Sequence, residues 1–249
     1  MSTAANPYAH FGMTAAQAPA DARATFIRKT YIHLAVAVYA FAALEWALFQ
    51  IVPEETMQNS ITWVFSGWNA LIFFGAFIGV GYLADSWARS DASPAMQYAG
   101  LSLYVVAEAI FFVPLLFFAK EYTSDIPALG QVNVIGVAGV ITLVMFGGLT
   151  ATVLISRKDF SFLRTALSIG GFAVFGLIIC SMMFGFELGM FFSVAMIVFA
   201  CGYILYYTSN ILHHYRTDQY VAASLALFAA VALLFWYVLQ VVISLSSRD

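Results

Sequence analysis

Long apolar segments alternate with short polar breaks along the chain. A helix needs about 20 apolar residues to cross a bilayer, and seven segments are long enough. They are Thr30–Val52, Thr62–Ala84, Gln97–Ala119, Val132–Ile155, Leu163–Phe184, Leu188–Tyr207 and Tyr220–Leu245. The residue-by-residue alternation typical of membrane-spanning strands is absent. The pattern therefore predicts an all-α polytopic membrane protein with a seven-transmembrane-helix bundle.

Turn-forming and charged residues mark the breaks between these segments. The clearest are Pro53–Glu55, Asp91–Pro94, Asp125–Pro127, Arg157–Asp159 and His213–Arg216. The break at Gly185–Gly189 is short and predicts a tight helical hairpin. Residues 1–22 are Ala-rich and polar and lack the features of a cleavable signal. We expect a flexible cytoplasmic tail over 1–22 and one transmembrane domain over 23–249.

The composition agrees with lipid as the solvent. The chain is 63% hydrophobic and only 9% charged, with a mean hydropathy of +0.89. A soluble domain carries about 25% charged residues, which this chain lacks. The net charge of -3 gives no basic excess, so no nucleic acid partner is expected.

The basic residues predict the orientation of the chain in the membrane. Eight of them fall on one side of the predicted spans: Arg23, Arg28, Lys29, Arg89, Arg157, Lys158, Arg164 and Arg216. The other side has only Lys120 and Arg248. Cytoplasmic loops carry the excess of Lys and Arg. We therefore expect a multi-pass protein of the cell inner membrane, with a cytoplasmic N-terminus.

Few ionisable groups lie within the predicted spans. Glu108 is near the middle of the third span, Glu45 lies in the outer part of the first, and Asp85 lies at the inner end of the second. His33 lies near the inner end of the first span. An ionisable group in lipid is costly and is therefore a functional candidate. The three acids are the candidates for an ion or proton site.

Glu108 has no basic partner within any predicted span. Three alternatives stay open: a neutral acid hydrogen-bonded between helices, a group facing a water-filled cavity, or a ligand for a cation entering that cavity. Polar groups do link helices in membranes, which makes the first alternative the simplest. Glu45 could instead extend its carboxyl toward the outer interface. Pro114, beyond Glu108, is expected to kink the third helix.

His213 and His214 follow the sixth span. Adjacent side chains on a helix point about 100° apart, so these two are poor joint ligands and no metal site is predicted. They are candidates for cytoplasmic pH sensing, with a solvated loop pair as the alternative. The chain contains no H-E-x-x-H, G-x-S-x-G or P-loop motif. We therefore assign no catalytic residue and no cofactor and expect a non-enzymatic protein.

Four stretches together resemble the Bax inhibitor-1 superfamily, in its bacterial YccA-like branch. They are Phe26–Tyr31, Ala107–Pro114, Thr150–Leu163 and Ile204–His213. The third is the most specific, because the family joins its fourth and fifth helices with a similar basic D-F-S segment. The resemblance, which covers Arg23 to Ile243, implies six helices around a central one. It also implies the family's activities: some members are pH-sensitive calcium leaks, others modulate stress responses, and the bacterial branch is linked to a membrane-bound AAA protease.

The chain departs from the calcium-leak members at their gate. Those members carry one aspartate in the sixth helix, in an L-Y-D-T motif, and another in the seventh. Here the motif reads L-Y-Y-T, so Tyr207 stands where the aspartate would be, and the matching place in the last span falls near Ala230. The second span also lacks the arginine that pairs with this dyad in some relatives. Without two close carboxylates there is no coupled proton switch, and calcium finds few of the oxygen ligands it needs.

Two functional classes stay open. The first is a non-enzymatic regulator or accessory subunit of other membrane proteins, such as a membrane AAA protease complex, in a stress response. The missing dyad favours this class. The second is a pH-sensitive calcium or cation leak that relies on Glu108 and Glu45. The expected partners are membrane lipids, other membrane proteins and, for the leak, a cation.

Overall fold

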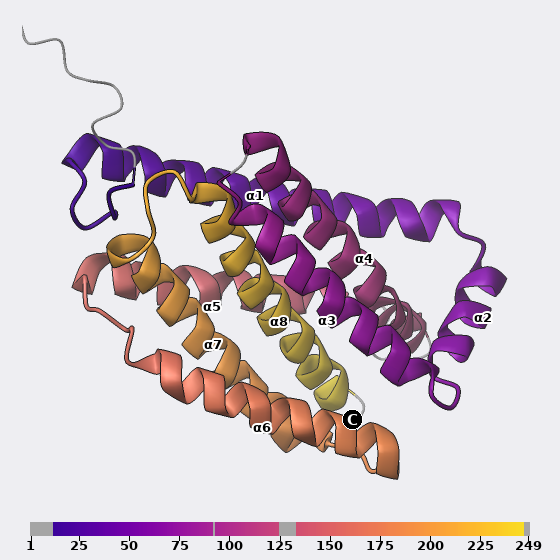
Figure 1. Cartoon of the computed structure of the whole chain (residues 1–249). Coiled ribbons are helices and arrows are strands. Elements are labelled where there is room, and N and C mark those ends of the chain that lie inside the picture. The colour runs from indigo at the N-terminus through magenta and orange to yellow at the C-terminus, as the bar shows by residue number, and fades with distance from the viewer. Residues whose placement is uncertain (1–11, 92, 125–132, 247–249) are drawn as a thin grey trace, which may run out of the picture.

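A computed structural model describes residues 12–91, 93–124 and 133–246 (Figure 1). In these ranges the chain forms eight helices. They are α1 (Ala20–Ile51), α2 (Glu54–Val64), α3 (Asn69–Ala88), α4 (Pro94–Ser124), α5 (Val134–Ser156), α6 (Leu163–Phe184), α7 (Gly189–His213) and α8 (Tyr220–Ser246). All except α2 are long and apolar enough to cross a bilayer. The predicted seven-transmembrane, all-α bundle is confirmed, and the chain is a multi-pass membrane protein.

Helix α2 is the element that the apolar pattern misses. The predicted second span, Thr62–Ala84, is wrong at its start, because Thr62 lies in the last turn of α2, which ends at Val64, and the spanning helix α3 begins only at Asn69. Between them Gly67 adopts a φ of 56°, a conformation that glycine reaches without steric cost. Two carboxylates in the first turn of α2 suit the positive end of a helix dipole. The hydropathy pattern merges this short helix with the apolar residues that follow it.

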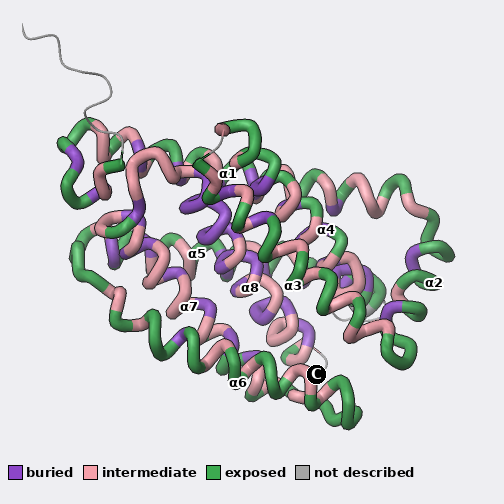
Figure 2. The backbone as a smooth tube through the Cα atoms, viewed as in Figure 1, coloured by how far each residue is buried: buried purple, intermediate pink, exposed green. Residues whose placement is uncertain are grey.

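Helix α8 is the centre of the bundle (Figures 1 and 2). It is buried along most of its length, and Leu227, Leu234 and Leu239 are fully buried. It packs against α1, α3, α4, α5 and α7, whereas α6 packs mainly against α7. This arrangement agrees with the central helix that the resemblance implied.

Glycines set two local features of the bundle. Gly185 and Gly189 have positive φ angles of 71° and 68° and form the tight hairpin between α6 and α7 that the sequence predicted. Gly100 lies where α4 crosses α3 most closely. A Cβ atom at Gly100 would lie 2.5 Å from the carbonyl oxygen of Ala84 and 2.6 Å from the amide nitrogen of Ala88. Only glycine permits this approach of the two backbones.

One end of the bundle carries most of the basic residues. The loops α3–α4, α5–α6 and α7–α8 lie there, together with the start of α1 (Figure 1). We call it the basic end, defined by Arg23, Arg28, Lys29, Arg89, Arg157, Lys158, Arg164 and Arg216. Of the two basic residues expected on the other side, Lys120 lies near the end of α4 and Arg248 is outside the described residues.

The segment before α1 packs onto the basic end. Thr14 forms an isolated antiparallel bridge with Arg216. The amide of Ala15 donates to the carbonyl oxygen of Tyr215 at 2.8 Å, and Ala15 is fully buried. These contacts fall within the predicted tail, residues 1–22, of which residues 1–11 lie outside the described part.

Candidate functional site

A partly open cavity of about 750 Å³ lies among α3, α4, α6, α7 and α8. It reaches inward to Tyr104 and Tyr207 and outward to Val64, Phe65 and Glu187. Because Val64 ends α2 and Glu187 lies in the α6–α7 turn, the cavity extends to the end opposite the basic end. A volume of this size matches sites for small organic ligands, about 300–1,000 Å³.

Glu108 lines the inner part of this cavity from α4 and is only 4% exposed. Tyr104, one helical turn earlier on α4, lines the same cavity. No ion pair within the described ranges involves Glu108. The structure thus places Glu108 on a cavity wall with a phenol as its neighbour. The sequence left that placement open among three alternatives.

Tyr207 and Ala230 line the same cavity, from α7 and α8. Tyr207 stacks on Tyr203 with ring centroids 5.6 Å apart, and Ala230 is buried. The positions that the resemblance assigns to the gating aspartates therefore face one space but carry a phenol and a methyl group. In the described part of the chain, no group of three or more His, Cys, Asp or Glu side chains is placed to hold a metal ion.

Glu45 lies apart from the cavity. It is 6% exposed on α1, so its carboxyl does not extend outward as the sequence allowed. Neither carboxyl oxygen has a hydrogen-bond partner among the described residues. Lys120 contacts the ring of Phe49 instead, with its Nζ 5.8 Å from the ring centroid. Glu45 and Glu108 therefore do not form one site.

Asp85 is engaged at the basic end. Arg89, which follows α3, donates from Nε to both oxygens of Asp85 at 2.8 and 2.9 Å. The Arg89 guanidinium also lies over the ring of Tyr215, 5.9 Å from its centroid. Asp85 is thus paired with Arg89, and it is Arg89 that links the end of α3 to the α7–α8 loop.

The two candidate pH-sensing histidines have different surroundings. His214 Nε2 lies 3.3 Å from Oδ2 of Asp159, in the α5–α6 loop. His213 points elsewhere, and its Nε2 is buried without a partner in the described residues. The two rings have centroids 6.2 Å apart, and their planes are inclined at 58°. Only His214 is placed where its protonation would change an ion pair.

Asp159 accepts a set of hydrogen bonds that join the α5–α6 loop to α7 and that the sequence did not predict. We call these contacts the Asp159 tie. Oδ1 of Asp159 accepts from the Ser161 amide at 2.8 Å and from the Ser209 hydroxyl at 3.3 Å. Ser209 Oγ in turn accepts from the Phe160 amide at 2.8 Å. The Ser161 amide is the main cause that holds the pKa of Asp159 below its ordinary value, with His214 adding to it. The signal in the sequence was the D-F-S segment, which carries all three loop residues.

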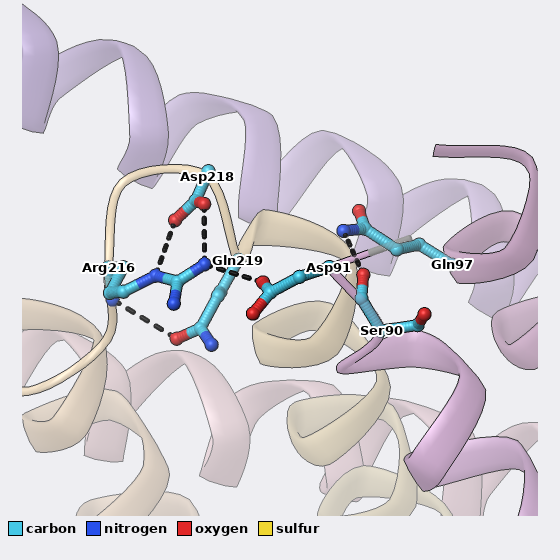
Figure 3. Close-up of polar contacts among 6 residues, drawn as sticks. All are labelled: Ser90, Asp91, Gln97, Arg216, Asp218 and Gln219. Atoms are coloured by element: carbon cyan, nitrogen blue, oxygen red, sulfur yellow. Dashed lines mark hydrogen bonds and ion pairs between the residues drawn. The ribbon is translucent and has the colours of Figure 1, made fainter. Parts of the chain in front are cut away.

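Arg216 forms a second set of loop contacts that the sequence did not predict (Figure 3). Its guanidinium donates to both oxygens of Asp218, at 3.0 and 2.7 Å, and to Oδ1 of Asp91 at 2.6 Å. The hydrogen bonds from Arg216 hold the pKa of Asp218 below its ordinary value. Asp91 lies in the α3–α4 loop, so this arginine joins two loops that are far apart in the sequence.

The fold and the cavity define a seven-span helical membrane protein with an acid-containing internal site. Residues 23–248 match the family model described as Inhibitor of apoptosis-promoting Bax1. Because the match covers nearly the whole chain, the protein belongs to the Bax inhibitor-1 family.

Two curated relatives are similar over part of their length. An uncharacterized protein of Pseudomonas aeruginosa is 35% identical over 112 residues, which cover 44% of this chain and 49% of the relative. Bax inhibitor 1 of Schizosaccharomyces pombe is 34% identical over 117 residues, or 44% of this chain and 42% of the relative. The chain thus matches about half the length of these relatives. No solved structure matches.

Proposed function

We propose that this protein is a non-enzymatic regulator or accessory subunit of other membrane proteins, such as a membrane AAA protease, in a stress response. One observation carries the proposal. Among the described residues, the only other carboxylate on the cavity wall is Glu187, in the α6–α7 turn, and the two positions that would hold the gating pair are Tyr207 and Ala230. A coupled two-carboxylate switch cannot operate with one acid. A protein that keeps the family fold without the gating pair is suited to binding other membrane proteins.

An open helix face on α5 supports this role. Gly147 and Gly148 are exposed, and a Cβ atom built on either would meet nothing within 4 Å. Gly170 and Gly171 of α6, by contrast, lie against Phe199 and Tyr203 inside the bundle. Small residues let transmembrane helices approach closely. The α5 face is therefore available to a helix of a partner protein.

Co-purification under mild detergent tests the proposal. The tagged protein is expected to retain a stoichiometric membrane-protein partner, and a Gly147→Leu variant is expected to lose it. Gly176→Leu on α6 is the matched control, because that glycine also has open space around it. A protein that purifies alone from native membranes, in both wild-type and variant forms, contradicts the proposal.

We further propose that the basic end faces the cytoplasm of a bacterial-type cell and that the membrane is the inner one. The support is the gathering of Lys and Arg at that end, where positive-inside orientation places them. Single cysteines introduced at Asp91 and Glu187, in a background without the two natural cysteines, test it. A membrane-impermeant thiol reagent added to intact spheroplasts should label the Glu187 position and spare the Asp91 position, and the reverse pattern overturns it.

A cation leak is the second candidate, favoured by the presence of Glu108 on the wall of a large cavity. If cations pass this carboxylate, flux through reconstituted protein should fall when Glu108 is replaced by glutamine. Background flux in wild-type and Glu108→Gln proteins alike rules out the leak and leaves the regulator proposal intact. Conversely, a leak without any co-purified partner would favour the channel.

A further inference from the structure

The charge of the cavity lining is one-sided. Glu108, toward the inner end, and Glu187, in the α6–α7 turn, are both carboxylic acids. No Lys, Arg or His contributes to the lining within the described part of the chain. An occupant that carries positive charge would therefore meet an acid at each end and no opposing cation.

The rest of the wall is largely aromatic. Phe111 is the hub, with Phe77 stacked on it at 4.2 Å between ring centroids, Phe73 at 5.7 Å and Trp236 at 5.0 Å. Trp236 also meets Phe112 edge to face at 5.0 Å. Aromatic faces attract cations electrostatically, and the attraction grows when the cation is removed from water. The rings also offer the apolar surface that a lipophilic ligand needs.

The cavity is too large for a bare ion to be its best-fitting occupant. A cavity of about 750 Å³ is far larger than a dehydrated metal ion, and the described residues offer no cluster of ligands for one. An inorganic cation would leave most of the aromatic wall without contact. A bulky organic cation would fill the space and bring its charge to the carboxylate.

We propose that the cavity binds a lipophilic organic cation, an amine, quaternary ammonium or phosphonium with an apolar body. The body packs against the aromatic wall around Phe111 and Trp236, and the charge lies next to Glu108. Tyr104, one helical turn from Glu108 on α4, lines the cavity beside it. This inference goes beyond the proposed regulatory role, and either can fail without the other.

Tetraphenylphosphonium and tetraphenylborate test the proposal, because they share one shape and carry opposite charges. Binding is measured to purified protein in nanodiscs, with an equal amount of empty nanodiscs subtracted. We expect saturable binding of tetraphenylphosphonium and none of tetraphenylborate. Equal binding of the two ions would mean that the cavity takes any apolar body, a lipid chain included, and would overturn the proposal.

Variants identify the site. Glu108→Gln should weaken tetraphenylphosphonium binding at least tenfold, whereas Glu55→Gln, on the exposed surface of α2, should leave it unchanged. Gly171→Leu is a second variant that fills the cavity and leaves Glu108 intact. A Cβ atom at Gly171 makes only ordinary contacts, at 3.5 Å from the Tyr203 hydroxyl, so this variant is expected to fold. Unchanged affinity in both cavity variants would place the bound cation elsewhere and contradict the proposal.

Discussion

Arg216 and Asp91 are 125 residues apart in the sequence, yet Nη2 of the arginine lies 2.6 Å from Oδ1 of the aspartate. The same nitrogen bonds Asp218, so one guanidinium joins the α3–α4 loop to the α7–α8 loop. The bridge between Thr14 and Arg216 adds the segment before α1 to this junction. Three separate parts of the chain therefore meet at one residue of the basic end.

Arg216→Gln should lower the stability of the bundle by up to about 1 kcal/mol, the upper range for partly exposed ion pairs. The glutamine is uncharged and has too few N–H donors to replace the three hydrogen bonds of the guanidinium. Thermal unfolding in detergent measures the change as a lower Tm. Arg164→Gln is the control, since Arg164 forms no ion pair in the part of the chain that the structure describes. Equal Tm values for the two variants would show that the Arg216 junction contributes nothing to stability.

The Asp159 tie should make the α5–α6 loop sensitive to acid. The pKa of Asp159 is held below its ordinary value, chiefly by the Ser161 amide, so the folded state favours the carboxylate. The resulting stability is present above the ordinary value of about 3.9 and is lost as the pH falls through the lower, folded value. Asp159→Asn should therefore reduce Tm at pH 7, with a difference that shrinks below about pH 4.

A variant of His214 tests how much the stability of the Asp159 tie depends on the His214–Asp159 ion pair. His214→Gln removes one contact of Asp159 and leaves the bonds from Ser161 and Ser209. We expect a smaller loss of Tm at pH 7 than for Asp159→Asn. A larger loss would mean that the histidine, rather than the backbone amide, holds the loop.

Close backbone packing at Gly100 gives a strong stability prediction. Gly100→Ala forces a methyl group against the backbone of Ala84 and Ala88, so α3 and α4 must separate. Overpacking of this kind costs about 1–3 kcal/mol. Gly147→Ala has open space and a better helix former, so it should be neutral or stabilising by up to about 1 kcal/mol. Chemical denaturation of the two variants compares them directly, and a tolerated Gly100→Ala would contradict the close crossing.

Introducing two carboxylates at the positions of the missing gating pair tests whether that pair is what calcium flux requires. Tyr207→Asp combined with Ala230→Asp puts both acids on the wall of one cavity. Two close carboxylates titrate as a coupled pair and supply oxygen ligands for calcium. We expect calcium flux that varies with pH and exceeds the wild-type flux severalfold in liposomes. The Tyr207→Asn and Ala230→Asn double variant controls for shape, and equal flux in both would show that the acids are irrelevant.

The spanning helices were predictable because their signal is local. Each spanning segment is apolar along its whole length, and the break at Gly185–Gly189 is short enough to force a hairpin. Helix α2 was not predictable, since its eleven residues are too short to span a membrane and adjoin the apolar start of α3. The starting residue of α1 was also missed, because the polar residues before Thr30 continue the helix from Ala20 without an apolar signal.

The candidate site was predictable only in part. Sequence alone singled out Glu108 as a costly acid, and the resemblance pointed to Tyr207 and Ala230. The shared cavity depends on how five helices pack, which no local pattern contains. The pairing of Asp85 with Arg89 follows helical spacing and could have been foreseen, whereas the bond from Arg216 to Asp91 depends on loop contacts far apart in sequence.

The central claim is that Glu108 alone does not make a calcium pathway. Calcium release from liposomes that contain the purified wild-type protein, read with a calcium-sensitive dye at pH 6 and pH 8, tests it most directly. We expect release at the level of protein-free liposomes at both pH values, for the wild type and for Glu108→Gln. Release well above that level in the wild type, abolished by Glu108→Gln, would contradict it.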